Sequence, residues 1–186
     1  MATQDINKNT YTGASFSARN RFARMLWGIV YTIFFKYSPR PLHQWRSLLL
    51  RLFGAKVGKG VHVYPGVKIW APWNIEFGDE CGVGGGAILY SQGKIILGYR
   101  CIISQGAYIC TGSHDYTKQG HPLITAPITV EALAWVAAEA FIHPGVTIGE
   151  GAVIGARSVV IKDMPAWTVC AGNPCKVLKN RVITDK

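Results

Sequence analysis

His114 and Asp115 stand side by side in the stretch YICTGSHDYTKQGH, residues 108–121. The imidazole of a histidine titrates near neutral pH, so it can take the proton of a hydroxyl group while that hydroxyl attacks a carbonyl carbon. We therefore predict a general base at His114, with Asp115 and Tyr116 beside it as substrate contacts. The alternative is a turn histidine that only bonds its own loop while Asp115 is solvated.

A six-residue repeat runs through most of the chain from Val57 onward. It can be written in hexads such as VGKGVH, VYPGVK, IHPGVT and IGEGAV, of which fourteen in fifteen begin with Val, Ile or Leu. The fifth position is Gly, Ala, Ser, Val or Cys in thirteen of the fifteen, with Trp73 and Met164 as exceptions. Neither a helix nor a β-meander has a six-residue period, so the repeat indicates a solenoid.

Each hexad predicts one short strand on one flat side of a triangular prism, and three hexads close one coil. The first and fifth residues should point inward, while Gly and Pro occupy the corners, where the backbone turns tightly. The early coils advance by twenty residues, and we assign the extra pair, such as Ile75 and Glu76, to a bulge at a corner. About five coils result, over residues 57–165, with Cys81 and Cys101 stacked inside as small apolar side chains.

The repeat is interrupted once, directly after the hexad ICTGSH. Residues 115–129 contain no hexad, and the pattern resumes at Val130. Loops of that length in a compact domain are usually functional, so we interpret them as an insertion that leaves the prism beside His114. The pattern ends at Pro165, and residues 166–186 are expected to form a C-terminal extension.

Positive charge is concentrated in the N-terminal third. The formal net charge is +10, yet residues 1–60 hold ten Lys and Arg against one acidic residue, Asp5. Residues 1–18 are polar and are expected to be a flexible N-terminus. Residues 19–56 form a basic, amphipathic helical segment, in which the apolar run from Met25 to Phe35 is too short for a bilayer span of about 20 residues.

Two interpretations of residues 19–56 stay open: a helical cap on the first coil, or a hairpin lying on the anionic cytoplasmic face of a membrane. A nucleic-acid partner is not expected, because the basic residues alternate with large aliphatic ones. The apolar stripe of the second helix would hold Leu42, Trp45, Leu49 and Leu52. Membrane contact would use charges from Arg21, Arg24, Arg46 and Arg51 and insertion of Trp27 and Trp45.

The hexads resemble the left-handed β-helix of the hexapeptide-repeat acyltransferases. The stretch PGVTIGEGAVIGARSVV and the ending MPAWTVCAGNPCKVLK are similar to the C-terminal pattern of that family. ISQGAYICTGSHDYT most resembles the branch of sugar O-acetyltransferases that act in colanic acid and other exopolysaccharide synthesis. The resemblance covers about residues 15–182, and the left hand of the helix is implied by it alone, since crossovers between parallel strands generally favour the right hand.

The resemblance also implies that acetyl-CoA is the acyl donor and that the chain forms a homotrimer, with the donor between neighbouring prisms. Carried onto this chain, Trp135 matches the tryptophan that opens a donor-binding motif of the family. The backbone N–H of Ala138 would contact the donor or the reacting thioester, where it could stabilise an oxyanion. The backbone of Ala156 would make another contact along the pantetheine.

Further positions follow from the same resemblance. Lys162 and Lys176 match basic positions near the CoA phosphates, and Asn173 belongs to the turn beside the adenine. Some members hold the acceptor with an asparagine on the preceding coil, and this chain has VGGGAI there. We expect Gln105 to contact the acceptor instead.

Together these expectations describe an O-acetyltransferase that acts on a sugar hydroxyl, free or lipid-linked, in surface-glycan synthesis by direct transfer. N-acetylation of an amino sugar or a non-catalytic trimeric scaffold are the alternatives. A zinc hydratase on this solenoid would need three converging histidines, and the gap from His114 to His121 does not match that family. Five cysteines without CxxC spacing indicate reduced thiols, no metal and a cytoplasmic location, peripheral to the membrane in the second interpretation above.

Overall fold

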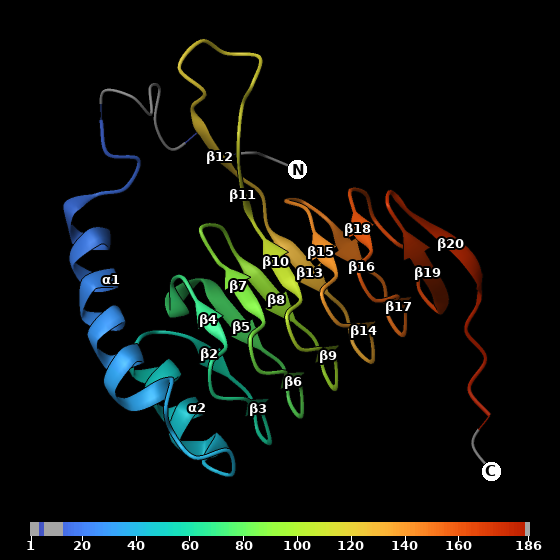
Figure 1. Ribbon diagram of the computed structural model, residues 1–186, viewed down its shortest axis with the longest axis horizontal. Coiled ribbons are helices and arrows are strands. Elements are labelled where there is room, and N and C mark those ends of the chain that lie inside the picture. The colour runs from blue at the N-terminus through green and yellow to red at the C-terminus, as the bar shows by residue number, and fades with distance from the viewer. Residues whose placement is uncertain (1–3, 6–12, 185–186) are drawn as a thin grey trace.

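The computed structural model describes residues 4–5 and 13–184. Figure 1 shows a column of short stacked strands, with helices at its N-terminal end and a hairpin that projects from one edge. Strands of successive coils pair in parallel and in register, for example Tyr108 with Ile88 on one side and with Phe141 on the other. The predicted parallel β-helix is confirmed.

Five complete coils make a prism with three sides, and a sixth coil begins with a bridge between Ile148 and Met164. Side 1 contains β2 (Lys56–Val57), β5 (Ile75–Phe77), β8 (Ile95–Leu97), β13 (Ile128–Val130) and β16 (Thr147–Ile148). Side 2 contains β3 (His62–Val63), β6 (Gly82–Val83), β9 (Ile102–Ile103), β14 (Trp135–Val136), β17 (Val153–Ile154), β19 (Thr168–Gly172) and β20 (Cys175–Asn180). Side 3 contains β4 (Lys68–Ile69), β7 (Ile88–Tyr90), β10 (Tyr108–Cys110), β15 (Phe141–Ile142) and β18 (Val159–Val160).

The inward positions follow the hexads. Val83, Ile103, Ile148 and Ile154 are fully buried, as the first position of a hexad requires. At the fifth position, Cys81 and Cys101 are buried and interact, and this interaction together with burial raises the pKa of the Cys101 thiol. Large aliphatic and small side chains therefore alternate along the core, and their removal from water drives the stacking of the coils.

The extra residues of the twenty-residue coils do not form a bulge. Ile75 and Ile95 are the first residues of β5 and β8, and they pair with each other in register. Both are buried, and the chain returns from the insertion with Ile128 in the same column. The prediction of a corner bulge is wrong. Ile75 and Ile95 are additional inward-facing residues, and their burial lengthens β5 and β8.

The insertion is a β-hairpin. β11 (Gly112–His114) pairs antiparallel with β12 (Leu123–Thr125), and β1 (Gln4–Asp5) adds to the other edge of β12. The chain therefore leaves the prism at Gly112, three residues before the expected start of the loop at 115, and is back in side 1 at Ile128. Most of the expected flexible N-terminus, 1–18, lies outside the described residues.

The C-terminal part stays on the prism beyond Pro165. β19 pairs in parallel with β17 on side 2, and β20 then turns back to pair antiparallel with β19. Part of the expected extension 166–186 thus continues the solenoid, since Cys170 fills an inward position and is fully buried.

The helical segment covers the first coil. It consists of α1 (Ala18–Val30), a π-helical turn η1 (Tyr31–Phe35) and α2 (His43–Leu52). Trp27 is 3% exposed, packs against Phe35 and Phe53, and donates its indole N–H to the carbonyl of Ile69 at 2.8 Å. No helix of the described residues is long and apolar enough to cross a bilayer.

The buried face of α2 differs from the predicted stripe. Leu49 is buried, but Leu42, Trp45 and Leu52 are exposed, whereas Arg46 is 0% exposed. The Arg46 guanidinium donates to the carbonyls of Val63, Pro39 and Arg40 and to the hydroxyl of Ser38. These acceptors explain why a cation faces the prism. They belong to residues outside α2, so the spacing of residues within α2 could not predict them.

Candidate active site

His114 ends β11 at the point where the hairpin leaves side 3. Its Nδ1 lies 2.6 Å from the carbonyl oxygen of His121. A carbonyl oxygen can only accept, so Nδ1 carries the hydrogen and Nε2 keeps a lone pair. The neutral imidazole is thereby oriented with a proton-accepting nitrogen available, as a general base requires.

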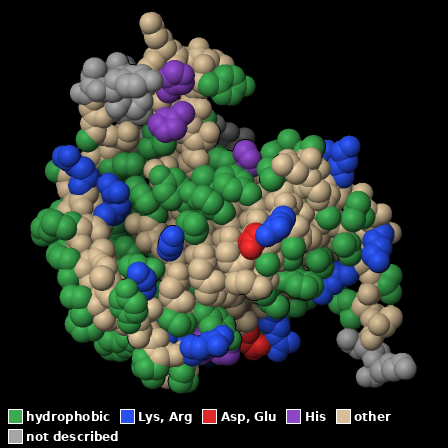
Figure 2. Space-filling view, in the orientation of Figure 1, with side chains coloured by type: hydrophobic (Ala, Val, Ile, Leu, Met, Phe, Trp, Pro, Cys, Tyr) green, Lys and Arg blue, Asp and Glu red, His purple; other side chains and the backbone are tan. Residues whose placement is uncertain are grey.

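The His114 side chain lines a pocket of about 320 Å³, which we call the His114 pocket. Figure 2 shows histidine side chains at the projecting hairpin above a band of hydrophobic side chains. α1 and the segment before it form one wall, and side 3 and the hairpin form the other. The pocket is lined by Ala14, Ser15, Phe16, Arg21, Arg24, Trp70, Tyr90, Gln92, His114 and Leu123.

One polar atom of this pocket has no partner. The Gln92 Nε2 donates to the Tyr90 hydroxyl at 3.0 Å, while its Oε1 is buried and accepts no hydrogen bond from the described residues. Gly112 leaves space for this amide, because a Cβ there would overlap Gln92 Oε1. This oxygen is buried against Gly112, so the amide is held by packing at the edge of the His114 pocket that Gln92 lines.

Cys110, four residues before His114, is not an activated nucleophile. Its thiol is buried and donates to the carbonyl of Gly112 at 3.3 Å. Burial raises the pKa of Cys110, which keeps the sulfur protonated. Because the thiolate is the reactive form, this cysteine gives no reason to expect a covalent acyl-enzyme.

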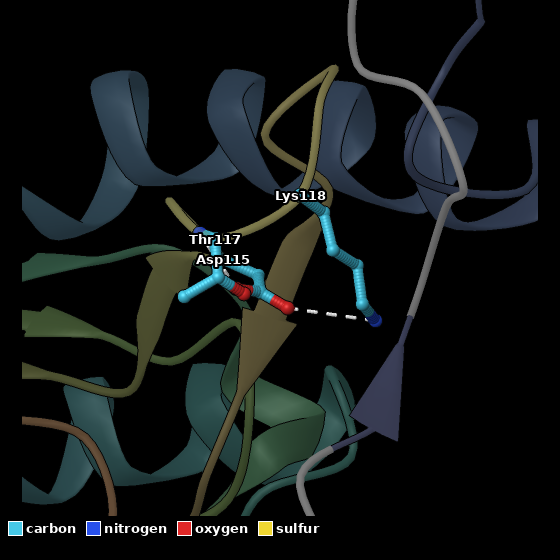
Figure 3. Close-up of polar contacts among 3 residues, drawn as sticks. All are labelled: Asp115, Thr117 and Lys118. Carbon is cyan, nitrogen blue, oxygen red and sulfur yellow. Dashed lines mark hydrogen bonds and ion pairs between the residues drawn. The ribbon is translucent and has the colours of Figure 1, made fainter.

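Asp115 and Tyr116, the predicted substrate contacts, belong to the hairpin turn. Asp115 Oδ1 accepts from the N–H of Thr117 at 3.0 Å and from its hydroxyl at 2.6 Å, while Oδ2 lies 3.5 Å from the Lys118 ammonium (Figure 3). The Thr117 hydrogen bonds, with a smaller effect of Lys118, lower the pKa of Asp115. Tyr116 is 85% exposed, and neither residue lines the His114 pocket.

The predicted acetyl-CoA contacts Ala138 and Ala156 and the predicted acceptor contact Gln105 lie along the corner between sides 2 and 3. Glu139 N–H donates to the carbonyl of Gln105 at 3.1 Å, and Arg157 N–H donates to that of Ala138 at 2.9 Å. These bonds stack Gln105, Ala138 and the segment of Ala156 on successive coils. Trp135 lies beside them on side 2 and donates its indole N–H to the hydroxyl of Ser104 at 2.8 Å.

The remaining predicted donor residues lie at the C-terminal coil. Lys162 and Lys176 line a hollow of about 340 Å³ together with Asp163, Met164, Pro165 and Val177, and Asp163 accepts a hydrogen bond from the Thr147 N–H. Both lysines are exposed, and Asn173 is exposed in the turn between β19 and β20. The structure thus places the two lysines around one hollow, and their contact with phosphate groups stays a prediction.

Within one chain, His114 lies apart from the proposed acetyl-CoA contacts Ala138 and Ala156, which stack on successive coils and which we call the donor column. His114 projects from the edge of side 3 where the chain turns toward side 1, and Gln105, Ala138 and Ala156 occupy the opposite edge. A side of six residues measures up to ~20 Å, whereas proton transfer needs contacts of about 3 Å. A second chain must therefore bring a donor column to His114 if both act in one reaction.

Among residues 4–5 and 13–184, no group of three or more His, Cys, Asp or Glu side chains is placed to hold a metal. The Nδ1 of His114 donates to the backbone carbonyl of His121. His43 and His62 stack on each other at 4.5 Å, on the far side of the first coil.

Known proteins are similar to this chain over most of its length. The chain is 46% identical over 170 residues to the "Putative colanic acid biosynthesis acetyltransferase WcaF" of Escherichia coli, which covers 91% of this chain and 93% of that protein. The chain belongs to the hexapeptide-repeat acetyltransferases. The galactoside O-acetyltransferase of Escherichia coli is 32% identical over 152 residues, covering 80% of this chain and 74% of that one.

Solved structures of hexapeptide-repeat acetyltransferases superpose over almost the whole chain. The enzyme VCA0836 of Vibrio cholerae in complex with acetyl coenzyme A has a TM-score of 0.82 and 26% identity, covering 91% of this chain and 93% of that one. A galactoside acetyltransferase in complex with coenzyme A has a TM-score of 0.82 and 25% identity, covering 90% and 84%. No family model matches the chain.

This hexapeptide-repeat acetyltransferase is therefore an enzyme that uses acetyl-CoA, and its solenoid is the left-handed parallel β-helix expected from the resemblance. The hydratase and non-catalytic scaffold alternatives are set aside by this membership. The proposals for the acceptor and for the catalytic base rest on the geometry of the His114 pocket.

Sequence reasoning missed most of the residues that surround His114. Trp70 and Tyr90 hold equivalent outward positions twenty residues apart, each directly after the inward aliphatic residue of a side 3 strand. Two aromatic residues in register on one side were a signal in the sequence. Gln92 gave no signal, because its unpaired oxygen becomes visible only when the hairpin is in place.

Proposed function

We propose that this acetyltransferase transfers the acetyl group of acetyl-CoA to a hydroxyl of a sugar, with His114 as the general base. The observation that carries the proposal is the hydrogen bond from His114 Nδ1 to the His121 carbonyl, because it leaves Nε2 as the proton acceptor of a residue that lines the pocket. The relative named galactoside O-acetyltransferase supports a sugar as the acceptor.

The chemistry needs one base and no covalent enzyme intermediate. His114 Nε2 takes the proton of the acceptor hydroxyl while that oxygen attacks the thioester carbonyl carbon. A tetrahedral oxyanion forms, for which we propose the backbone N–H of Ala138 as donor. Collapse breaks the C–S bond, and the imidazolium returns its proton to the leaving sulfur, so that the acetyl ester and CoA are the products.

The His114 pocket has the composition of a sugar site. The rings of Trp70 and Tyr90 offer apolar surface for the C–H face of a pyranose, and the Tyr90 hydroxyl is a polar group at its edge. The Gln92 side chain lines the same pocket and adds an amide beside the Tyr90 hydroxyl, to which its Nε2 donates. These three residues replace Asp115 and Tyr116 as our proposed acceptor contacts within the chain.

A trimer supplies the missing half of the site. We infer that the Ala138 corner of a neighbouring chain faces His114, so that Trp135, Ala138 and Ala156 hold the donor there. Lys162 and Lys176 would bind CoA phosphates, and Asn173 the adenine side. Gln105 shares this corner, so we keep it as an acceptor contact made across the chain boundary.

The outer face of the helical cap is apolar and lacks acidic residues. No Asp or Glu occurs between Asp5 and Glu76. We infer that this face lies on an anionic membrane surface, since apolar contact and positive charge act together there. The role predicted for Arg46 and Trp27 is wrong, because both are buried. The exposed apolar residues of α1 and η1 include Phe22, Met25, Leu26, Ile29 and Ile33.

The proposed reaction is tested by measuring CoA thiol release from acetyl-CoA with free sugars, amino sugars, nucleotide sugars and lipid-linked saccharides. Mass and proton NMR spectra of the product distinguish an ester from an amide. We expect O-acetylated sugar. Transfer to amino groups alone would replace the proposal by N-acetylation, and no transfer to any saccharide would reject it.

A further inference from the structure

A second hollow adjoins the His114 pocket along side 3. It has a volume of about 310 Å³ and shares Trp70 and Tyr90 with the pocket. Together the two form a trough between the α1–η1 helix and side 3, within the range of ~300–1,000 Å³ that is typical of small-molecule sites. The second hollow is lined by Tyr31, Lys68, Ile69, Trp70, Ile88, Leu89, Tyr90 and Tyr108.

A continuous row of aromatic rings forms the floor of the trough. Phe16 contacts Trp70 at 4.7 Å between ring centroids, Trp70 contacts Tyr90 at 6.2 Å, and Tyr90 contacts Tyr108 at 6.0 Å. Trp70, Tyr90 and Tyr108 are only half-buried, so each ring keeps surface open to a ligand. Trp70 stands at 67° to Tyr90, and Tyr90 at 85° to Tyr108, so the rings do not form one flat surface. Each ring can instead contact the C–H face of a separate pyranose, whose hydroxyls reach polar groups at the edges.

The trough carries positive charge and no carboxylate. Arg21 and Arg24 line the His114 pocket and Lys68 lines the second hollow, and neither lining set contains Asp or Glu. The Arg24 guanidinium carbon lies 4.3 Å from the Trp70 ring centroid, so a cation occupies one face of Trp70 at the His114 end of the trough. An anionic ligand is favoured by this arrangement of charges.

We propose that the trough is an acceptor groove with two subsites, which takes an acidic saccharide of at least two rings. The reacting ring occupies the His114 pocket, and this part rests on the proposed function. The next ring lies on Tyr90 and Tyr108, with its anionic group at Lys68. A single ring would leave the second hollow empty, which is why the aromatic row and Lys68 indicate a longer acceptor.

The test uses the full-length trimer saturated with CoA or acetyl-CoA and a panel of neutral and uronic mono-, di- and tetrasaccharides, with sugar phosphates and nucleotide sugars as further arms. Calorimetry gives Kd, and thiol release gives kcat/KM. We expect uronic disaccharides to bind at least about tenfold more tightly than monosaccharides. The uronic and phosphate arms show which anion Lys68 selects.

Two variants locate the second subsite. Lys68→Met should reduce the preference for acidic over neutral disaccharides up to about fivefold, since a partly exposed charge pair contributes up to ~1 kcal/mol. Tyr108→Leu should weaken disaccharides and leave monosaccharides unchanged. Tyr37→Ala and Lys179→Met, whose residues lie outside both hollows, serve as matched controls and should change neither.

The outcomes separate the two proposals. Equal binding of monosaccharides and acidic disaccharides, a preference for nucleotide monosaccharides, or unchanged selectivity in Lys68→Met and Tyr108→Leu would reject the groove, even with O-acetylation established. Selective binding of acidic disaccharides without acetyl transfer would reject the reaction and retain the groove.

Discussion

The carbonyl of His121 holds the side chain of His114 across the β11–β12 hairpin, with 2.6 Å between the oxygen and Nδ1. The two residues belong to segments whose strands pair residue by residue, Gly112 with Thr125 and His114 with Leu123. The hairpin therefore fixes both the position and the tautomer of the neutral imidazole, so the proposed base is oriented by a backbone carbonyl rather than by an acidic side chain.

Replacement of His114 by alanine should lower kcat by roughly 10²–10⁴-fold, the usual contribution of a general base. The KM for acetyl-CoA and the oligomeric state should change little, because the donor column lies on another edge of the prism. Steady-state kinetics and sedimentation measure both. His121→Asn keeps the carbonyl and suits the positive φ at 121, so it should lose less than about tenfold. Wild-type turnover in His114→Ala would contradict the assignment.

Lys162→Ala and Lys176→Ala should each raise the KM for acetyl-CoA several-fold with little effect on kcat, because a charge that binds phosphate acts equally in ground and transition states. The matched measurement uses acetyl-dephospho-CoA, which lacks the 3′-phosphate. If either lysine meets that group, its variant discriminates less between the two donors. Identical ratios in wild type and both variants would exclude contact with the 3′-phosphate.

Arg46→Met should destabilise the protein by about 3 kcal/mol, because it leaves the buried carbonyl of Val63 and the partly buried carbonyls of Pro39 and Arg40 without their charged donor. Thermal or chemical unfolding measures the change. Arg51 also donates to backbone carbonyls, those of Val57 and Gly58, but it is exposed, so Arg51→Met is a control with an expected cost below about 1 kcal/mol. Similar costs for both variants would contradict the role of Arg46.

Stability should fall as the pH decreases from 7 toward 5, in part through His43. Partial burial, then the charges of Arg46 and His62, lower the pKa of His43 below its ordinary value. The unfolded chain, whose histidine pKa is near 6.5, then binds more protons than the folded chain. The stability that His43 contributes is therefore present above about pH 6.5 and is lost as the pH falls below it. Thermal midpoints across this range should fall less steeply in His43→Gln than in wild type.

The helical cap should bind vesicles of phosphatidylcholine and phosphatidylserine more strongly than vesicles of phosphatidylcholine alone, and less at high salt. Replacing Phe22 and Ile29 together by serine should abolish co-sedimentation, because both side chains are exposed on α1. Tyr116→Ser, at the exposed turn of the hairpin, is the control. Retention of binding in the double variant would show that another surface is used.

The six-residue repeat explains which parts of the fold could be predicted from the sequence. A residue such as Ile103 faces inward because of its place in its own hexad, so the sequence alone predicts its burial. The face of α2 depends instead on carbonyls that belong to other segments, and Arg46 was therefore assigned to the surface. The strand role of Ile75 was missed for a related reason, since only pairing with Ile95 shows that it lies in a column.

The site was predictable only where a short motif carries it. His114 follows from the stretch TGSH and the break in the repeat. The rest of the His114 pocket combines α1 with two coils and the hairpin, so Arg24, Trp70 and Gln92 meet through the tertiary structure. In the proposed trimer, Trp135 and Ala138 reach His114 from a neighbouring chain, and the hexads of a single chain do not predict that arrangement.

β20 runs antiparallel to β19 and so terminates the parallel stacking of coils on side 2. Each coil of a parallel β-helix offers its successor the same rows of N–H and C=O groups, so an uncovered final coil could pair with another molecule and grow as a filament. On side 2 an antiparallel strand carrying Lys176 and Lys179 occupies that edge, and charged edge strands resist further pairing. Resistance to polymerisation and the proposed binding of donor phosphate thus depend on the same strand, so selection for one constrains how far the other can change.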